Sequence, residues 1–197
     1  MGELKSTDGR AARGKRTRQQ IIDAFVALCG EGNLIPTAQQ VAERANVGLR
    51  TVFRQFNEME TLFVEIDEQL KSEHAFRFEA LLPGGSLDER IARLISVRVD
   101  AFEHISPFIH SMLCQTWRYP AMEASYKRFV DKLNSDLVSC IPELQTATRT
   151  RLAAADLTCS FECYNRLRRT GHSKKETGHV MELLLRGAIT EHLTDNG

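Results

Sequence analysis

The chain has 197 residues, of which 42% are hydrophobic and 26% charged, which is ordinary for a globular protein of one or two small domains. No apolar run approaches the roughly 18 residues of a membrane-spanning helix, which argues against a membrane protein. The N-terminal stretch is polar and basic, so we expect no secretory signal and a cytoplasmic location.

The net charge is zero, with 26 basic and 26 acidic residues, but the charges are unevenly distributed. Residues 1–56 carry nine Lys or Arg and five Asp or Glu, so this end has a net charge of +4. A basic end on a neutral chain predicts a polyanionic partner for that end alone. The five scattered cysteines include no Cys-x-x-Cys pair, and we expect them to be reduced.

Apolar residues recur at helical rather than strand spacing, so we predict an all-α fold of about nine helices. Residues 1–15 are expected to form a flexible basic arm. The first helix is predicted from about Thr17 to Gly30, because apolar residues stand at positions i, i+3, i+4 and i+7 counted from Ile21.

Two short helices are predicted to follow. The first begins at Thr37, since Thr37 and Gln40 fit the capping box, an N-cap threonine with a glutamine three residues later. Asn46 stands where the chain must turn, and asparagine tolerates a left-handed backbone better than most residues. Gly48 can cap the next helix, which is expected over about 49–55.

Two short helices joined by a tight turn form a helix-turn-helix, whose second helix enters the major groove of DNA. Val52 and Phe56 are expected to point inward, which leaves the other side chains of that helix on the outside. Arginine can pair with guanine, glutamine with adenine, and an aliphatic group with the thymine methyl, while threonine suits phosphate. The predicted DNA contacts are Thr37, Gln39, Leu49, Arg50, Thr51, Phe53, Arg54 and Gln55.

The alternative for this segment is that Arg50 and Arg54 merely solvate a surface helix. An exposed Phe53 between two arginines favours a contact surface instead.

The remaining sequence is also predicted to be helical. The strongest break lies at residues 83–86, and Ser106-Pro107 is expected to start a new helix because proline is tolerated in a first turn. The other predicted helices span about 59–81, 88–104, 122–140, 143–170 and 174–193.

The helix-turn-helix segment resembles the TetR-type transcriptional repressors over residues 17–63. The shared pattern is T-x-x-x-[IV]-A-x-x-A-x-V-[SG]-x-x-T-[LV]-[YF]-x-x-F, then an acidic residue and a leucine. Here it reads Thr37, Val41-Ala42, Ala45, Val47-Gly48, Thr51-Val52-Phe53, Phe56, Glu60 and Leu62. The resemblance implies a three-helix DNA-binding domain over 16–62 and a helical effector-binding and dimerisation domain over 63–197.

Three residues depart from the family pattern. Asn46 replaces the usual glycine of the turn, Phe53 replaces a tyrosine, and Met59 replaces a lysine that contacts phosphate. We therefore expect weaker DNA affinity, or a greater dependence on the cations of the arm. Those cations are Arg13, Lys15, Arg16 and Arg18.

The resemblance also implies a homodimer in which the last two long helices of each subunit form a four-helix bundle. The predicted helix 143–170 has apolar residues on two opposite arcs, which indicates burial on both sides. The final helix carries a matching stripe. The predicted interface residues are Leu152, Ala155, Cys159, Cys163, Met181, Leu184, Leu185 and Ala188.

A ligand cavity among the middle helices is a further implication of the resemblance. Effector binding would favour a spacing of the two DNA-binding domains of the dimer that does not match successive major grooves of DNA. The alternative is that the aromatic residues are core and the polar ones face solvent. The candidate lining residues are Arg98, Phe102, His104, Phe108, His110, Cys114, Trp117, Glu162, Tyr164 and Asn165.

The predicted function is a ligand-responsive repressor that binds a palindromic operator as a dimer and is released by a small hydrophobic or amphipathic effector. The alternative is a DNA-binding regulator of the same fold that is controlled by a protein partner. No catalytic triad, carboxylate pair, phosphate loop or metal-ligand spacing stands out, which disfavours an enzyme. No cofactor and no metal are expected.

Overall fold

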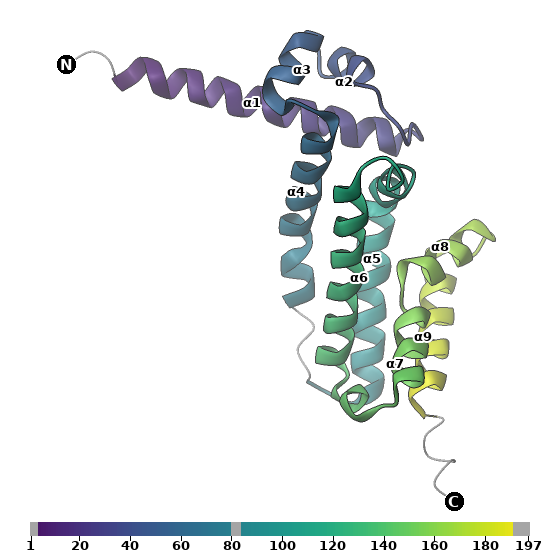
Figure 1. The fold of residues 1–197 in the computed structure, drawn as a ribbon. Helices are drawn as coiled ribbons and strands as arrows, with labels where there is room; N and C mark the ends of the chain where they lie inside the picture. Colours follow the sequence, from purple (N-terminus) through teal and green to yellow (C-terminus); the bar gives the residue numbers. More distant parts are fainter. Residues whose placement is uncertain (1–3, 80–83, 191–197) are drawn as a thin grey trace, which may run out of the picture. The chain divides into compact units, whose positions relative to one another are not determined.

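A computed structural model of the chain describes residues 4–79 and 84–190, and every regular element in these ranges is a helix (Figure 1). The predicted all-α fold is confirmed. No helix in the described ranges is both long and apolar enough to cross a membrane. The helices are α1 (Leu4–Gly30), α2 (Ala38–Arg44), α3 (Leu49–Phe56), α4 (Met59–Glu79), α5 (Leu87–Leu113), α6 (Pro120–Cys140), η1 (Pro142–Thr146), α7 (Arg149–Thr158), α8 (Phe161–Arg169) and α9 (Lys174–Thr190).

The chain forms two compact units. The first, the N-terminal unit, comprises Met1–Leu70 and Pro107–Tyr126, and the second, the C-terminal unit, comprises Lys71–Ser106 and Lys127–Gly197. The N-terminal unit is therefore larger than the predicted domain 16–62.

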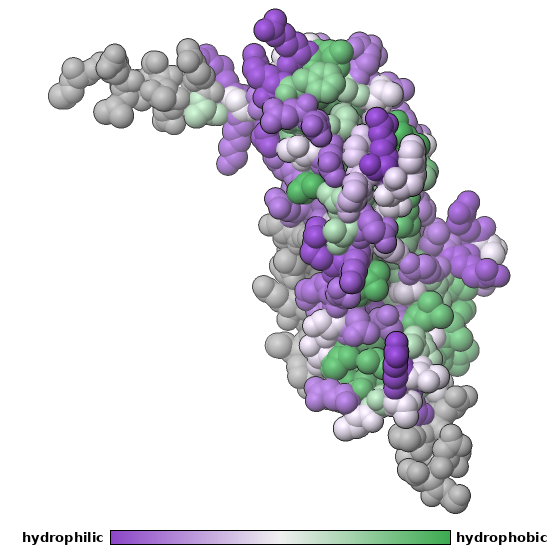
Figure 2. All heavy atoms as spheres, in the orientation of Figure 1, coloured by the Kyte–Doolittle hydropathy of each residue, from purple (hydrophilic) through white to green (hydrophobic). Residues whose placement is uncertain are grey.

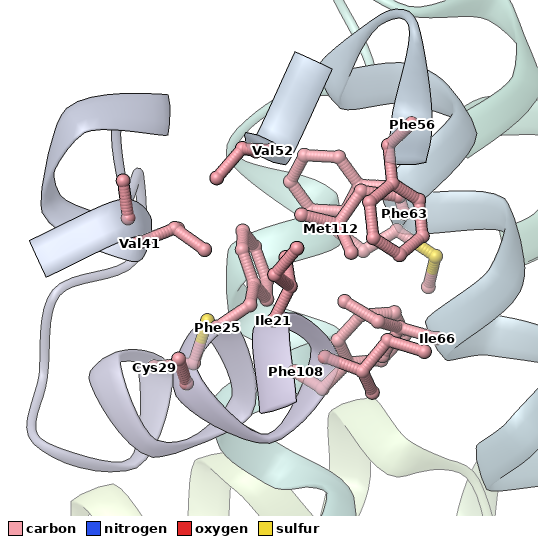
Figure 3. Packing of buried hydrophobic residues seen from close by; sticks show 14 of the residues in the cluster. Ile21, Phe25, Cys29, Val41, Val52, Phe56, Phe63, Ile66, Phe108 and Met112 are labelled. Carbon is pink, nitrogen blue, oxygen red and sulfur yellow. The ribbon is translucent and has the colours of Figure 1, made fainter. Parts of the chain in front are cut away.

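Packing explains why the N-terminal unit includes the later segment. Its core joins Phe25 of α1, Val52 and Phe56 of α3 and Phe63 of α4 with Phe108 (Figure 3). The rings of Phe25 and Phe63 meet edge to face with their centroids 4.8 Å apart. Burial of apolar side chains is the dominant favourable term in folding, so the segment is part of the unit whose core it helps to bury.

The predicted helix caps and the turn of the helix-turn-helix are confirmed. Thr37 caps α2, because its hydroxyl accepts from the Gln40 backbone N–H at 3.2 Å and Gln40 Oε1 accepts from the Thr37 N–H at 2.9 Å. Asn46 has a φ of 53°, the left-handed conformation expected for the turn. Gly48 is the N-cap of α3.

Replacing Thr37 by alanine removes both bonds of the capping box. We expect the free energy of unfolding to fall by about 1 kcal/mol, the typical value of a lost N-cap. Urea denaturation monitored by circular dichroism measures this change. Thr61→Ala is the matched control, because Thr61 is exposed and has no hydrogen-bond partner within the described ranges. An equal loss in both variants would contradict a specific role for the cap.

Two boundaries before α6 differ from the sequence prediction. The arm predicted to be flexible is helical from Leu4, as a continuation of α1, and residues 1–3 lie outside the described ranges. Pro107 does not start a helix but lies inside α5. Proline fixes a φ value that the helix also requires and removes only one backbone donor, so a long helix can retain it.

The predicted helix 143–170 is interrupted twice. Thr148 is the N-cap of α7 and Ser160 is the N-cap of α8, and their hydroxyls accept from the N–H groups of Arg151 and Cys163. Side chains of serine and threonine compete with the helix for backbone donors, which makes them good first residues and poor interior ones.

Candidate nucleic-acid interface

Helix α3 presents a sharply divided surface. Val52 and Phe56 are buried in the core, whereas Leu49 is 39% exposed and Phe53 44% exposed. Arg50 and Arg54 are also exposed, and neither has an ion-pair or hydrogen-bond partner in the described part of the chain. A large apolar side chain left in water beside free guanidinium groups is the composition expected of a contact surface.

The four other predicted contacts are less free. Gln39 donates from Nε2 to Glu43 Oε1 at 2.6 Å, and the Thr37 hydroxyl is used in its cap. Thr51 and Gln55 are half-buried. Thr51 and Gln55 flank the exposed face of α3, which is made by Leu49, Arg50, Phe53 and Arg54 and is called the α3 face below.

Arg18, predicted to belong to the DNA-binding arm, is engaged inside the unit. Its Nε lies 2.6 and 2.8 Å from the two carboxylate oxygens of Glu65, and Nη1 donates to the Gln55 carbonyl oxygen. The guanidinium also lies 4.2 Å from the centre of the Phe56 ring. Arg18 therefore connects α1, α3 and α4 and holds the end of α3 in place. It is a positioning residue, and its assignment to the free arm is corrected.

Met59 also has a structural explanation. It is half-buried and packs against the core of the N-terminal unit. An apolar residue at the start of α4 thus contributes burial where the family pattern has a lysine. The exposed cations Arg13, Lys15 and Arg16 are left to supply charge on α1.

Comparison with known proteins identifies the fold. No model of a protein family matches the sequence, and no curated protein matches it either. Solved structures do match. A TetR-family transcriptional regulator from Mesorhizobium loti MAFF303099 has a TM-score of 0.66 and 17% identity, and the match covers 91% of this chain and 98% of that one.

Two further structures agree. A transcriptional regulator from Rhodococcus sp. Rha1 has a TM-score of 0.69 at 15% identity, covering 89% of this chain and 96% of that one. The multidrug binding protein EbrR, complexed with imidazole, has a TM-score of 0.59 at 20% identity, covering 85% and 93%. This chain has the TetR-family fold. At these identities the likeness establishes the fold, and function has to be argued from the residues.

The ten residues predicted to line an effector cavity do not come together within either unit. Phe108, His110, Cys114 and Trp117 belong to the N-terminal unit, and the other six belong to the C-terminal unit. Trp117 is 81% exposed, and its Nε1 donates to the carbonyl oxygen of Cys114 at 3.0 Å.

Of the six in the C-terminal unit, His104 and Glu162 are exposed and Asn165 is half-buried. Phe102 and Tyr164 are core residues, with ring centroids 5.3 Å apart. The Tyr164 hydroxyl donates to Glu103 Oε1 at 2.8 Å. The aromatic residues therefore fill this unit rather than line a hollow in it, which corrects their assignment.

Arg98, the sixth, is completely buried in the C-terminal unit. Its Nη1 donates to the Cys159 carbonyl oxygen at 2.8 Å and to Cys159 Sγ at 2.7 Å, and Nη2 donates to the Leu133 carbonyl oxygen. Burial raises the pKa of the Cys159 thiol to about 11, although the Arg98 charge lowers it, so the thiol is protonated at neutral pH. Arg98 thus joins α5 to α6 and to the break between α7 and α8.

The predicted dimer residues separate into buried and accessible ones. Ala155, Cys159, Met181 and Leu185 are fully buried within the unit, so they are not available to a partner and their assignment is corrected. Leu152, Cys163 and Ala188 are half-buried, and Leu184 is exposed.

The predicted interface does not include the most accessible large apolar residues of the same helices. Leu157 of α7 and Leu183 of α9 are each 62% exposed, and α7 and α9 lie side by side (Figure 1). Figure 2 shows apolar side chains gathered over these two helices. Leu157, Leu183 and Leu184 are called the α7–α9 patch below.

Proposed function

We propose that this chain is a transcriptional regulator that reads DNA with α3. The observation that carries the proposal is the α3 face, in which Leu49, Arg50, Phe53 and Arg54 are exposed on a helix whose other face is buried. Arg18 contacts Gln55 and Phe56 at the end of α3 and holds the helix in place, so the exposed side chains are presented on a rigid element. The basic N-terminal end and the TetR-family fold support the same reading.

We further propose that the protein acts as a homodimer on a palindromic operator. The α7–α9 patch supports this, because three exposed leucines on adjacent helices are costly in water and pack well against a second copy. Two reading helices related by a two-fold axis require two half-sites related in the same way.

Selection of bound sequences from random double-stranded DNA, using the full chain, tests both proposals. The expected result is a palindrome whose half-sites lie about 10 base pairs or a multiple apart, one or more helical turns. Footprinting on the selected sequence then measures protection. Enrichment of no sequence at low salt would overturn the DNA-reading proposal, and enrichment of an isolated half-site would overturn the dimer.

Arg50→Ala measures base readout directly. If Arg50 pairs with a base, affinity for the selected operator should fall by about 1–3 kcal/mol, while affinity for unrelated DNA changes little. Binding is measured by fluorescence anisotropy at one fixed salt concentration. Arg169→Ala, which removes an exposed arginine of the C-terminal unit, is the matched control. An equal loss on all sequences would make Arg50 a phosphate contact.

A small-molecule effector that releases the operator is the finer part of the proposal. The structural similarity to a multidrug binding protein supports it. A test is the release of the footprint by added compounds.

The second candidate is regulation of DNA binding by a protein partner. The exposed side chains of Trp117 and Leu113 in the N-terminal unit favour this candidate. Binding of a partner protein that is lost in Trp117→Ala would support this candidate.

A further inference from the structure

Helices α5 and α9 of the C-terminal unit are connected by an ion pair at each end. Asp88 pairs with Arg186, and Asp100 Oδ1 lies 2.6 Å from Lys174 Nζ. Asp88 and Asp100 are twelve positions apart on α5, and Lys174 and Arg186 are twelve positions apart on α9. The first residue on one helix binds the last on the other, so the two helices are antiparallel and in register over roughly 18 Å. The two ion pairs enclose a stretch in which the helices face each other without a further ion pair between described residues.

A groove of about 490 Å³ lies between the helices along this stretch. Small side chains leave it open, because Ser96 of α5 and Gly178 of α9 both line it. A Cβ atom on Gly178 would meet only Ile95 Cγ2, at an ordinary distance of 4.0 Å. Packing therefore does not require a glycine here, although glycine weakens the interior of a helix. Its effect is to keep the groove open.

The groove has an apolar floor, with a lysine and a histidine at one end. Ile95 and Val99 form the floor and are almost fully buried. Lys175 and His179 stand one helical turn apart on the rim, and neither has an ion-pair or hydrogen-bond partner among the described residues. Both lie near the N-terminal end of α9, where the helix dipole also favours an anion. Glu182 lies farther along, one turn before Arg186.

The floor of the groove and Leu184 of the α7–α9 patch lie on different sides of α9. At 100° per residue, the buried positions Met181 and Leu185 face the core, with Gly178 and Glu182 on one side of that stripe and Leu184 on the other, whereas Leu183 lies one turn from His179 on the outward side. A second copy covering Leu184 would therefore leave the α5 side of α9 accessible.

We infer that the α5–α9 groove binds a small amphipathic anion, with an apolar chain on Ile95 and Val99 and an anionic head group beside Lys175 and His179. The volume lies within the roughly 300–1,000 Å³ of small-molecule sites. An open, partly apolar groove with the unpaired Lys175 ammonium and the His179 imidazole at one end favours an anionic head group over neutral and cationic ones of the same chain length. This site goes beyond the proposed function, because binding here requires no DNA.

Isothermal titration of the full chain with octanoate tests the inference. Octan-1-ol and octylammonium have the same chain with no charge and with the opposite charge. The expected result is saturable binding of octanoate at one site per chain, binding of the alcohol at least about tenfold weaker, and none of the amine. Equal binding of all three, or no saturation with octanoate, would overturn the inference. Operator binding is measured separately, so a failure to bind octanoate leaves the DNA-reading proposal standing, and a failure to bind DNA leaves this inference standing.

Two variants locate the site. Gly178→Leu fills the groove and should abolish octanoate binding, while the melting temperature shows whether the chain still folds. Lys175→Gln keeps the groove open and should weaken binding about threefold, as expected for one exposed charge contact. Arg169→Gln removes an exposed cation outside the groove and should leave binding unchanged. Unaltered octanoate binding in a folded Gly178→Leu protein, or in Lys175→Gln, would place the ligand elsewhere.

Discussion

Replacement of Arg98 by methionine is expected to lower the free energy of unfolding by about 2–4 kcal/mol, the largest stability effect of any single change considered. The methionine stem preserves most of the packing volume. The Cys159 carbonyl oxygen, however, lies at a break between two helices and loses its donor in the dry interior of the C-terminal unit. Leu133 lies within α6 and its oxygen keeps an intrahelical partner.

An opposing effect limits the loss. No ion pair to a carboxylate neutralises the Arg98 guanidinium among the described residues, and its buried Nε has no hydrogen-bond partner there. Removing a buried charge recovers part of the cost of its desolvation. The free-energy cost of the unpaired Cys159 carbonyl oxygen and of the lost charged hydrogen bonds exceeds the recovered desolvation free energy. The Arg98→Met protein is therefore expected to be less stable than the parent.

Chemical denaturation in urea measures the change in unfolding free energy. Arg169→Met is the matched control, since it makes the same substitution at an exposed arginine and should stay within about 0.5 kcal/mol of the parent. A stable Arg98→Met protein would show that the break between α7 and α8 is held by packing alone.

Local signals were sufficient for the helix-turn-helix. Thr37 and Gln40 stand at capping-box spacing, and Asn46 stands where only a left-handed residue can turn the chain. Each of these features is determined by neighbours within four residues, so the sequence contains the necessary information. The exposed face of α3 follows in the same way, because the burial of Val52 and Phe56 determines which side chains face outward.

Positions determined by distant contacts could not be predicted. Arg18 and Glu65 are 47 residues apart, and nothing in the sequence distinguishes Arg18 from the other cations near it. The C-terminal helices show the same limit. Their apolar stripes were recognised, but the choice between core and exposed surface depends on which neighbours cover each stripe. Met181 and Leu184 are three residues apart, and only the latter is accessible.

Breaks in long helices were the other source of error. Ser160 falls inside the predicted helix 143–170, although a serine hydroxyl can equally well accept from the third following N–H and start a new helix. Pro107 is predicted from its local chemistry to start a helix, although a 27-residue helix tolerates the loss of one donor. In both cases the local chemistry allows two outcomes, and tertiary packing selects one.

Neutralising Arg13, Lys15 and Arg16 together to glutamine is expected to have the largest effect on DNA binding. These exposed cations belong to α1, and neither an ion pair nor a hydrogen bond engages them in the described ranges. Each cation that contacts a phosphate releases about 0.9 of a counterion, so the slope of log affinity against log salt should become shallower by up to about 2.7. The half-buried Met59 provides no charge at the start of α4, which increases the dependence on these three.

Anisotropy titrations on the selected operator at several salt concentrations measure this slope. The matched control replaces Arg149, Arg166 and Arg169 by glutamine, which removes the same charge from the C-terminal unit. A change in net charge alone would alter both slopes equally, whereas phosphate contacts by α1 alter only the first. Glutamine is a good helix former, so a shallower slope reports lost charge rather than unfolding of α1. An unchanged slope would assign the phosphate contacts to α3 and leave the N-terminal part of α1 without a role on DNA.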